Sequence, residues 1–180
     1  MNYYQQLPLF NKLAEHYVIT ERMSLGLVSH WRKQMLKFAS LKDGDNVLDI
    51  MCGDGRIWST IKKKIGKSGS LTGIDYSQTM LSQMPVEDRN KTTCVAFQEN
   101  HIESNSKDVV ISSFGLKHLG KKDTSDLMNQ IERVLKPGGK YALIELKMPK
   151  NIFFRALIKH QLGFFNTIAK TRCPEKKCSV

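Results

Sequence analysis

Hydrophobic and polar positions follow two alternating rhythms along the chain. Short apolar runs, typical of buried strands, recur at residues 47–50, 70–74, 94–97, 108–112 and 141–145. Between these runs, apolar residues three or four positions apart predict amphipathic helices over residues 24–39, 56–65, 77–84 and 123–135. Alternating strands and helices favour right-handed crossovers, so the sequence predicts an α/β fold with a doubly wound, mostly parallel sheet.

The chain divides into three expected segments. Its 180 residues are enough for one domain with a sizeable core. Residues 1–40 are expected to form an N-terminal helical cap, and residues 41–149 a ligand-binding α/β unit. Residues 150–180 combine an apolar helix that carries a basic stripe with a loose tail from Thr171 onward. The turn residues 136–139 are expected to separate the last helix of the α/β unit from its fifth strand.

Basic residues outnumber acidic ones by 28 to 17, which gives a net charge of +11. A surface of this kind suits anionic lipid, nucleic acid or an acidic partner, and general solubility explains it equally well. No apolar run reaches about 18 residues and no secretory signal pattern is recognisable, so a cytoplasmic chain is expected. The four cysteines form no CxxC pair, which indicates reduced thiols, and no metal site is expected.

A glycine-containing loop, within the stretch NVLDIMCGDGRIW, follows the first predicted strand. Open parallel sheets bind ligands beyond the carboxyl ends of their strands, and Gly53 and Gly55 lie at that edge. Glycines let the backbone approach a ligand closely, while the following helix offers unpaired N–H groups. Asp75 ends the second strand, where a carboxylate can accept both hydroxyls of a ribose. These features predict a ligand that contains a ribose.

Two observations distinguish between the cofactors that carry a ribose. A dinucleotide fingerprint needs a third glycine at position 58, which is Trp58. A carboxylate ahead of the loop, at Asp49, would repel a pyrophosphate and attract an ammonium group. S-adenosylmethionine has both a ribose and an ammonium group, so it is the predicted cofactor. The competing structural explanation is that Asp49 caps a loop and Asp75 caps a helix.

At these residues the chain resembles the ubiquinone/menaquinone biosynthesis C-methyltransferase family, a group of class I S-adenosylmethionine methyltransferases. The resemblance is carried by FNKLAEHYVITERMSLGLVSHWRK, VLDIMCGDG, GIDYSQTML, ISSFGLKHL and RVLKPGGK, and it runs from about Phe10 to Pro149. It implies the Rossmann-like fold of class I methyltransferases. The family fold continues past the fifth strand with two more strands, which this chain is expected to lack because only residues 146–180 follow Glu145.

The resemblance also implies roles for individual residues. Asp49 and Gly53 would hold the methionine part of the cofactor, and Asp75 the ribose hydroxyls. Asp54 stands where the family has threonine and adds a negative charge near the methyl donor. The complete set of implied cofactor-binding residues is Asp49, Gly53, Asp54, Gly55, Asp75, Tyr76, Asn100, His101 and Ser113, with Tyr76 flanking the adenine, Asn100 and His101 near its edge, and Ser113 reaching the cofactor from the fourth strand.

Lys117 and His118 are the candidate catalytic residues, at a place where the family has arginine and asparagine. A ring carbon becomes nucleophilic when a neighbouring phenol loses its proton, and histidine titrates in the range that a general base requires. His118 would therefore take the proton, and Lys117 would stabilise the phenolate. The alternative is that both residues are solvent-exposed and lead into the next helix.

The sequence as a whole predicts a methyltransferase for a small aromatic or quinone-like acceptor, with peripheral contact at the inner face of a membrane. The apolar segment 151–170 is expected to cover the edge of the fifth strand, to form a homodimer or to lie on anionic lipid. Two alternatives stay open. The acceptor could be RNA or another small molecule, although no RNA-binding motif is present. The chain could also be a catalytically weak, cofactor-binding partner subunit.

Overall fold

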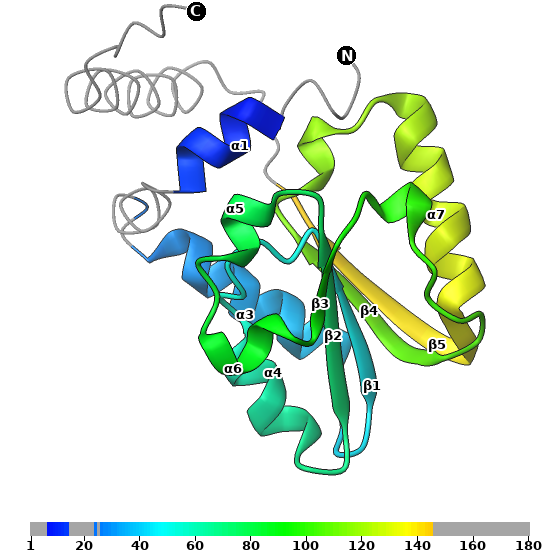
Figure 1. Ribbon diagram of the computed structural model, residues 1–180. Coiled ribbons are helices and arrows are strands. Elements are labelled where there is room, and N and C mark those ends of the chain that lie inside the picture. Colours follow the sequence, from blue (N-terminus) through cyan, green and yellow to red (C-terminus); the bar gives the residue numbers. More distant parts are fainter. Residues whose placement is uncertain (1–6, 15–23, 25, 146–180) are drawn as a thin grey trace, which may run out of the picture.

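The computed structural model describes residues 7–14, 24 and 26–145. Their strands form a five-stranded parallel sheet in the order β3-β2-β1-β4-β5 (Figure 1). The strands are β1 (Asn46–Ile50), β2 (Ser70–Asp75), β3 (Thr92–Cys94), β4 (Lys107–Ser113) and β5 (Leu135–Ile144). This order places the switch point between β1 and β4, and it confirms the predicted doubly wound α/β fold.

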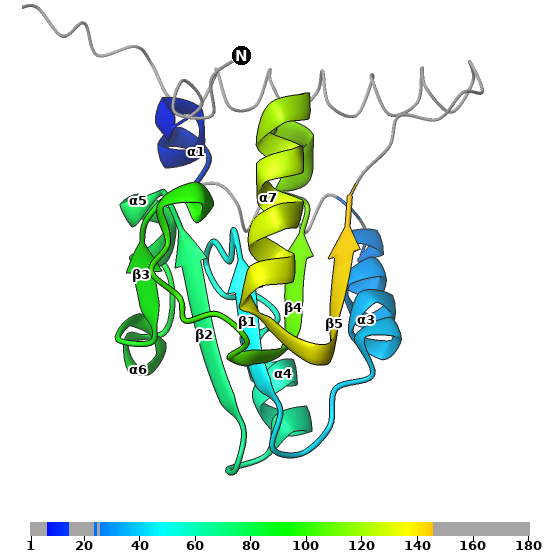
Figure 2. The same ribbon diagram turned by 90° about the vertical axis from the view of Figure 1, so that its right-hand side faces the viewer.

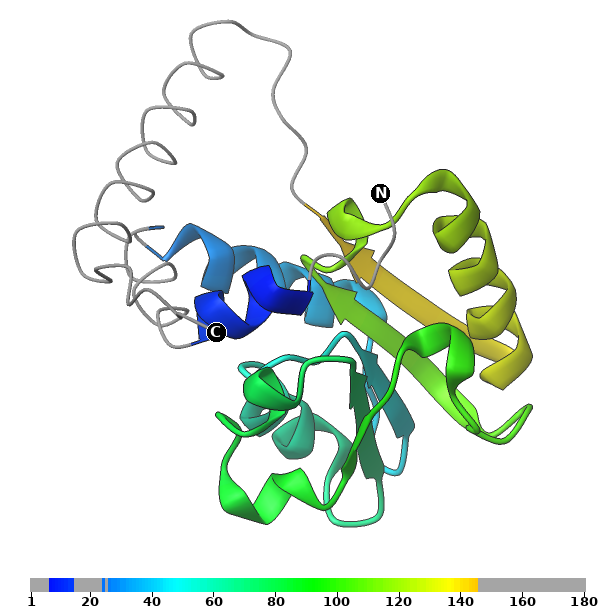
Figure 3. The same ribbon diagram turned by 45° about the horizontal axis from the view of Figure 1, so that its top comes forward.

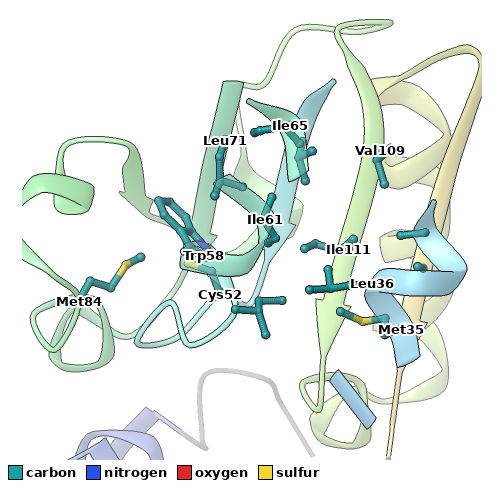
Figure 4. Packing of buried hydrophobic residues seen from close by; sticks show 14 of the residues in the cluster. Met35, Leu36, Cys52, Trp58, Ile61, Ile65, Leu71, Met84, Val109 and Ile111 are labelled. Carbon is teal, nitrogen blue, oxygen red and sulfur yellow. The ribbon is translucent and has the colours of Figure 1, made fainter. Parts of the chain in front are cut away.

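Helices cover both faces of the sheet (Figure 2). One face packs against α3 (Leu27–Ala39) and α4 (Trp58–Ile65), while the other packs against α7 (Lys121–Val134). Side chains alternate between the faces along each strand, so Val47 joins the first core cluster and Leu48 the second. Figure 4 shows the first cluster, in which Ile61 and Ile65 of α4 and Leu36 of α3 meet Val109 and Ile111 of β4.

Short helices complete the edge of the sheet at which the strands end. They are α1 (Leu7–Ala14) and α5 (Gln78–Leu81), whereas α6 (Val86–Arg89) lies at the start of β3 (Figure 2). The Ser77 hydroxyl accepts a hydrogen bond of 3.2 Å from the Met80 N–H, which confirms Ser77 as the N-cap of α5. The same hydroxyl donates to the side-chain oxygen of Asn11 at 2.7 Å. This bond ties α1 to the loop that follows β2.

Several element bounds differ from the sequence prediction: the helix expected over residues 77–84 spans only Gln78–Leu81, and two further differences have a clear structural cause. The third strand was expected at residues 94–97, but β3 ends at Cys94, and Phe97 starts the short 3₁₀-helix η2 (Phe97–Glu99). Phe97 is buried in the second cluster, which requires the chain to turn inward there. Residues 136–139 were expected as a turn, yet β5 starts at Leu135. The register of β4 and β5 is irregular opposite Asp108, and residues 136–139 form the extra length of β5 at this point. The Lys136 ammonium lies 2.8 Å from the Asp108 carboxylate.

The outer edge of β5 is not paired with another strand in the described part of the chain. α3 runs beside it (Figure 2), and an open groove between them is lined by Trp31, Phe38, Ala142 and Ile144, among others. Residues 151–170, which were predicted to cover this edge, lie outside the described residues, so their role stays a prediction. No helix within the described ranges is long and apolar enough to span a membrane.

Candidate active site

The carboxyl ends of β1, β2 and β4 meet at one edge of the sheet, where the loops that follow them surround a pocket. Its wall consists of Arg32, Met51, Cys52, Gly53, Asp54, Arg56, Ile57, Asp75, Tyr76, Met80, Ser113, Phe114 and Gly115. Five of the residues that the sequence assigned to the cofactor are therefore brought together, namely Gly53, Asp54, Asp75, Tyr76 and Ser113. Figure 3 shows α1 and α3 lying near the carboxyl ends of the strands.

The glycine loop between β1 and α4 has the backbone that its sequence predicts. Gly53 and Gly55 have φ angles of 57° and 69°, in the left-handed region that glycine tolerates best. A Cβ atom on Gly53 would lie 3.0 Å from the Met80 methyl group, and one on Gly55 would overlap Met84. Met84 packs in the first core cluster with Trp58 (Figure 4). The glycines thus let the loop lie tightly on the side chains beneath it.

Asp75, the acid that ends β2, fixes this loop from below. Its Oδ2 accepts a hydrogen bond of 2.9 Å from the Gly53 N–H, and its Oδ1 accepts one of 2.9 Å from the Ser77 N–H. Burial raises the pKa of Asp75, while the bonds from Ser77 and Gly53 lower it. Each carboxylate oxygen can accept a second bond. Asp75 therefore orders the loop and can still receive hydroxyl groups from the pocket.

Asp49 lies in β1, behind the glycine loop rather than in the pocket wall. It is 2% exposed, and its Oδ2 accepts a hydrogen bond of 2.9 Å from the Trp58 indole Nε1. Its Oδ1 is buried without a hydrogen-bond partner in the described part of the chain. Burial raises the pKa of Asp49 to about 7; the Trp58 bond lowers it, the charge of Asp75 raises it and that of Arg32 lowers it. A buried oxygen with unused acceptor capacity favours a donor from a ligand.

Trp58 has a role that the sequence did not reveal. Its position served only to exclude a dinucleotide fingerprint, yet the indole is fully buried and holds Asp49. A Cβ atom on Gly73 of β2 would lie 2.6 Å from the Trp58 ring. The missing side chain at Gly73 thus makes room for the indole. In the sequence, only the glycine of the loop and the tryptophan at the start of the next helix pointed to this region. Neither residue type predicts a hydrogen bond to Asp49.

Met51 and Phe114 have left-handed backbones although neither is glycine, with φ angles of 55° and 64°. Strain of this kind costs about 1–3 kcal/mol per residue and tends to cluster at ligand sites. The Phe114 N–H donates to the Ile144 carbonyl at 2.8 Å, which links the ends of β4 and β5. A Cβ atom on Gly115 would collide with Met51, so the two loops interlock. Sequence patterns do not predict such angles.

Two arginines of the pocket wall were also missed by the sequence analysis. The Arg56 Nε donates to the Asp54 carboxylate at 2.6 Å, which offsets the negative charge that Asp54 adds to the loop. Arg32 comes from α3, is 5% exposed, and places its guanidinium carbon 5.5 Å from the centre of the Phe114 ring. An arginine in an amphipathic helix is usually solvent-exposed, so its burial could not be predicted from the pattern.

Asn100 and His101, assigned to the adenine edge, do not line the pocket in the described structure. The Asn100 side-chain oxygen accepts bonds of 3.0 Å from Arg133 Nη2 and from the Ile102 N–H, and its amide donates to the Phe97 carbonyl. This arrangement joins the loop after η2 to α7. His101 is exposed. A contact between these two residues and the cofactor stays a prediction.

Lys117 and His118 follow β4 in the short 3₁₀-helix η3 (Leu116–His118). The Lys117 N–H donates to Glu145 Oε2 at 2.8 Å, and the Lys117 ammonium lies 4.0 Å from Glu145 Oε1. The Lys117 side chain is exposed and is not part of the pocket wall. The side chain of His118 lies outside the described part of the structure. The catalytic roles of both residues stay predictions.

The arrangement of the site fits an S-adenosylmethionine ligand. The pocket wall combines a glycine loop at the amino end of α4 with an acid at the end of β2. Behind the loop, outside the wall, lies a buried carboxylate with one unpartnered oxygen in the described structure. A ribose, an amino group and a purine need acceptors and a close backbone of this kind. No cluster of metal-ligating side chains occurs within the described residues.

Comparison with known proteins identifies the family. The model of the ubiE/COQ5 methyltransferase family matches residues 4–169. A demethylmenaquinone methyltransferase of Lactobacillus johnsonii is 31% identical over 170 residues, which are 90% of this chain and 69% of that protein. The ubiquinone/menaquinone biosynthesis C-methyltransferase of Bdellovibrio bacteriovorus is 31% identical over 83% of this chain and 65% of its own length. The chain thus spans about two thirds of the length of these curated relatives.

Solved structures agree on the fold. An S-adenosylmethionine-dependent methyltransferase from Aquifex aeolicus has a TM-score of 0.57 at 21% identity, covering 77% of this chain and 78% of that chain. A second one, from Methanococcus maripaludis, has a TM-score of 0.64 at 19% identity, covering 89% and 74%. The family match, the relatives and the glycine-and-acid pocket all lead to one conclusion: the chain belongs to the ubiE/COQ5 methyltransferase family and is an S-adenosylmethionine-dependent methyltransferase.

Proposed function

We propose that the chain methylates a ring carbon of a quinol-type acceptor. The observation that carries this proposal is the match to relatives named for such acceptors. They include the demethylmenaquinone methyltransferase of Lactobacillus johnsonii and a 2-phytyl-1,4-naphtoquinone methyltransferase of Nostoc punctiforme, which is 27% identical over 87% of this chain. The pocket beyond the carboxyl ends of β1 and β4 agrees with this reaction, since it can hold the methyl donor.

Each residue around the glycine loop is proposed to bind a different part of the cofactor. Asp75 would accept the ribose hydroxyls while it holds the Gly53 N–H, and Tyr76, which follows it, would lie beside the adenine. The unpartnered Oδ1 of Asp49 would accept a hydrogen bond from the amino group. Because Asp49 lies behind the glycine loop and does not line the pocket, this contact requires the loop to shift on binding. Because Gly55 has no side chain, the backbone of that loop can pack closely on Met84. Bound S-adenosylmethionine supplies an electrophilic methyl group on a sulfonium.

Alignment and proton removal are the remaining tasks of the protein. The acceptor carbon becomes nucleophilic when a ring hydroxyl is deprotonated, for which His118 is the proposed base. As the new carbon–carbon bond forms, the bond from the methyl group to sulfur would break and S-adenosylhomocysteine would be left. The same ring carbon would then lose its hydrogen as a proton to solvent, the oxygen would regain the proton held by His118, and aromaticity would return. Lys117 is proposed to stabilise the phenolate. To do so, its ammonium has to turn away from Glu145, from which it lies 4.0 Å in the present structure.

A second candidate is a cofactor-binding subunit with weak catalysis. The exposed position of Lys117, paired with Glu145 rather than facing the pocket, favours it. The net charge of +11 favours a further variant, in which the acceptor is RNA. Both candidates keep the same cofactor site. The RNA candidate differs from the quinol proposal in what receives the methyl group, and the partner-subunit candidate differs in how much methyl transfer takes place.

We further propose that the protein is cytoplasmic and that it contacts a membrane surface or forms a homodimer. Quinol acceptors with long apolar tails reside in lipid, and the positive net charge suits an anionic lipid surface. Trp31 and Phe38 of α3 are 49% and 80% exposed beside the edge of β5, as expected of a face that contacts lipid or protein.

The test is a methyl-transfer assay with the whole chain. S-adenosylmethionine labelled in its methyl group is incubated separately with a prenylated 1,4-naphthoquinol in anionic vesicles, with the same quinol in neutral vesicles, and with total RNA. The proposal expects label in the quinol, with faster transfer in anionic vesicles. Label in RNA alone would support the RNA acceptor. Binding of the cofactor without transfer to any acceptor would support the partner-subunit candidate.

A further inference from the structure

An exposed apolar stripe runs along α3, beside the groove at the edge of β5. Leu27, Trp31 and Phe38 are 61%, 49% and 80% exposed, although other side chains of this helix are buried in the first core cluster. At 100° per residue, the three positions fall within about 40° of one another around the helix. We call these three residues the α3 stripe. Apolar side chains gathered in this way on a well-packed helix indicate a contact surface.

The surface around the α3 stripe is positively charged. Lys33 and Lys37, the α3 lysines, lie one helical turn apart and are both exposed, and Lys37 also lines the groove. The two elements that bound the groove, α3 and β5, contain no acidic residue. The acid that follows β5, Glu145, accepts a hydrogen bond from the Lys117 N–H and lies 4.0 Å from the Lys117 ammonium. A partner of this surface therefore has to match positive charge next to apolar side chains.

Charge distinguishes between the partners that could cover this surface. A second copy of the chain would bring lysines against lysines, because the same elements would meet across a two-fold axis. Segment 151–170 of this chain has basic residues and no acidic one, so it would also add positive charge. Nucleic acid would neutralise the lysines but leave the apolar stripe in water. An anionic bilayer offers phosphates for the lysines and an interfacial layer for the aromatic rings.

We propose that α3 docks the protein on anionic membranes, with the α3 stripe inserted between lipid headgroups and the α3 lysines bound to lipid phosphates. The stems of the lysines can lie along the apolar surface while their ammonium groups reach the phosphates. The same helix supplies Arg32 to the wall of the cofactor pocket, so docking through α3 holds that pocket close to the lipid. The inference rests on the proposed function, because a quinol with an apolar tail has to be collected from a membrane.

Vesicle flotation with the full-length chain tests this contact. The vesicles contain phosphatidylglycerol mixed with phosphatidylcholine, or phosphatidylcholine alone. We expect binding to the anionic vesicles to be at least about 10-fold tighter, and to weaken as salt screens the lysines.

Tryptophan fluorescence reports which surface enters the lipid. The chain has two tryptophans, and Trp58 is only 1% exposed, so a change in emission on binding comes from Trp31. Its entry into the interfacial layer should shift the emission to shorter wavelength. Trp31→Phe should still bind the anionic vesicles and should lose this shift.

Phe38→Ser tests the apolar part of the surface, because it removes the most exposed member of the α3 stripe. It should weaken binding to the anionic vesicles by about 10-fold, since the phenyl ring no longer leaves water. Val86→Ser is the matched control, because Val86 is 74% exposed on α6, away from the groove. The control should bind as wild type does.

A double variant, Lys33→Gln with Lys37→Gln, tests the charged part. It should also weaken binding to the anionic vesicles by about 10-fold or more and reduce its salt dependence. Lys63→Gln with Lys64→Gln, at exposed positions on α4, removes the same charge elsewhere and should bind nearly as wild type does. Thermal unfolding verifies that all of these variants are folded.

Unchanged vesicle binding in the Phe38 and α3 lysine variants would overturn the inference, as would a wild-type protein that does not float with anionic vesicles. Dimers that both variants dissociate in sedimentation would overturn it as well, since the α3 stripe would then cover a second copy. Vesicle binding through α3 without methylation of a quinol would contradict only the proposed function. Methylation of a quinol by a protein that does not bind bilayers would contradict only the membrane contact.

Discussion

The indole Nε1 of Trp58 donates a hydrogen bond of 2.9 Å to the carboxylate of Asp49, beneath the glycine loop. The bond joins the first residue of α4 to β1, and both partners are buried. For one oxygen of the buried carboxylate, this hydrogen bond replaces the bonds to water that are lost on folding. The other oxygen then has a fixed direction, which a ligand site requires.

Replacing Trp58 by phenylalanine tests this bond. The phenyl ring is smaller than the indole, so the variant leaves a small cavity and also deprives the Asp49 oxygen of its donor. We expect the free energy of unfolding to fall by at least about 1–3 kcal/mol, the cost of the unpaired buried acceptor, with the cavity adding to this loss. Urea unfolding measures this change. Ile61→Val, one turn further along α4 in the same core cluster, is the control for small packing losses and should cost about 0.5–1.5 kcal/mol. If Trp58→Phe is as stable as wild type, the hydrogen bond between Trp58 and Asp49 does not contribute to the free energy of unfolding.

Asp49 should also make the stability of the ligand-free protein depend on pH. Its pKa is raised from 3.8 to about 7, chiefly by burial, so the folded state retains a proton that the unfolded chain releases near pH 4. Stability therefore falls as the pH rises from about 4 to about 7, and this contribution is constant above that range. Asp75, whose pKa is also raised, adds a fall of the same sign.

The Asp49→Asn variant isolates that contribution, because the amide oxygen can still accept the Trp58 bond. Its stability relative to wild type should increase by a few kcal/mol, on the order of 1.4 per pKa unit, as the pH rises through this window. Urea titrations at several pH values measure the difference. Parallel pH curves for the variant and wild type would show that Asp49 is ionised in the folded protein throughout.

Gly55→Ala should damage the loop more than an ordinary left-handed glycine would. Gly55 has a φ of 69°, and its added Cβ would overlap Met84. Gly138→Ala is the matched control, because Gly138 has a φ of 79° with no atom within 4 Å of the added Cβ. We expect the control to lose about 1–2 kcal/mol and Gly55→Ala to lose more, together with cofactor affinity. Equal losses in urea unfolding would mean that Met84 moves aside without cost.

Asp75→Ala should weaken cofactor binding by about 10-fold or more, since it removes the acceptor for the ribose hydroxyls and the tether of Gly53. Calorimetric titration with S-adenosylhomocysteine measures the loss. Glu132→Ala, an exposed acid on α7, should bind as wild type does. Unchanged affinity in the Asp75 variant, or tight binding of NAD by wild type, would contradict the assignment of the site.

His118→Ala should lower turnover on the order of 100-fold or more while cofactor affinity changes little, as expected when a general base is removed. His30→Ala provides the comparison, because His30 is exposed on α3 and is not part of the pocket wall. Methyl transfer at saturating cofactor and calorimetry together separate the two effects. Full turnover in the His118 variant would return this residue to a solvent-exposed role.

The sequence predicted the sheet and the glycine loop because both depend on local pattern. Apolar runs mark strands, and Gly53, Gly55 and Asp75 have types that only a few backbone positions favour. The contacts of Trp58 and Arg32 could not be predicted in the same way. Each depends on where another element packs, Gly73 of β2 for the indole and Phe114 of the β4 loop for the guanidinium.

The limits of the prediction around β3 have the same cause. Val95 and Phe97 have side chains that are common in strands, but burial of Phe97 in the second core cluster turns the chain inward. Asn100 was placed near the adenine by resemblance, and its bond to Arg133 joins residues that lie far apart in the sequence. Such long-range partners override local propensity.

The most direct test of the central claim is product analysis. The whole chain is incubated with S-adenosylmethionine that carries a deuterated methyl group and with a prenylated 1,4-naphthoquinol under reducing conditions, and the quinone is examined by mass spectrometry. The account predicts one deuterated methyl group on a ring carbon, one lost ring hydrogen and an equal amount of S-adenosylhomocysteine. Unmodified quinol in the presence of bound cofactor, or a methyl group on an oxygen atom, would contradict it.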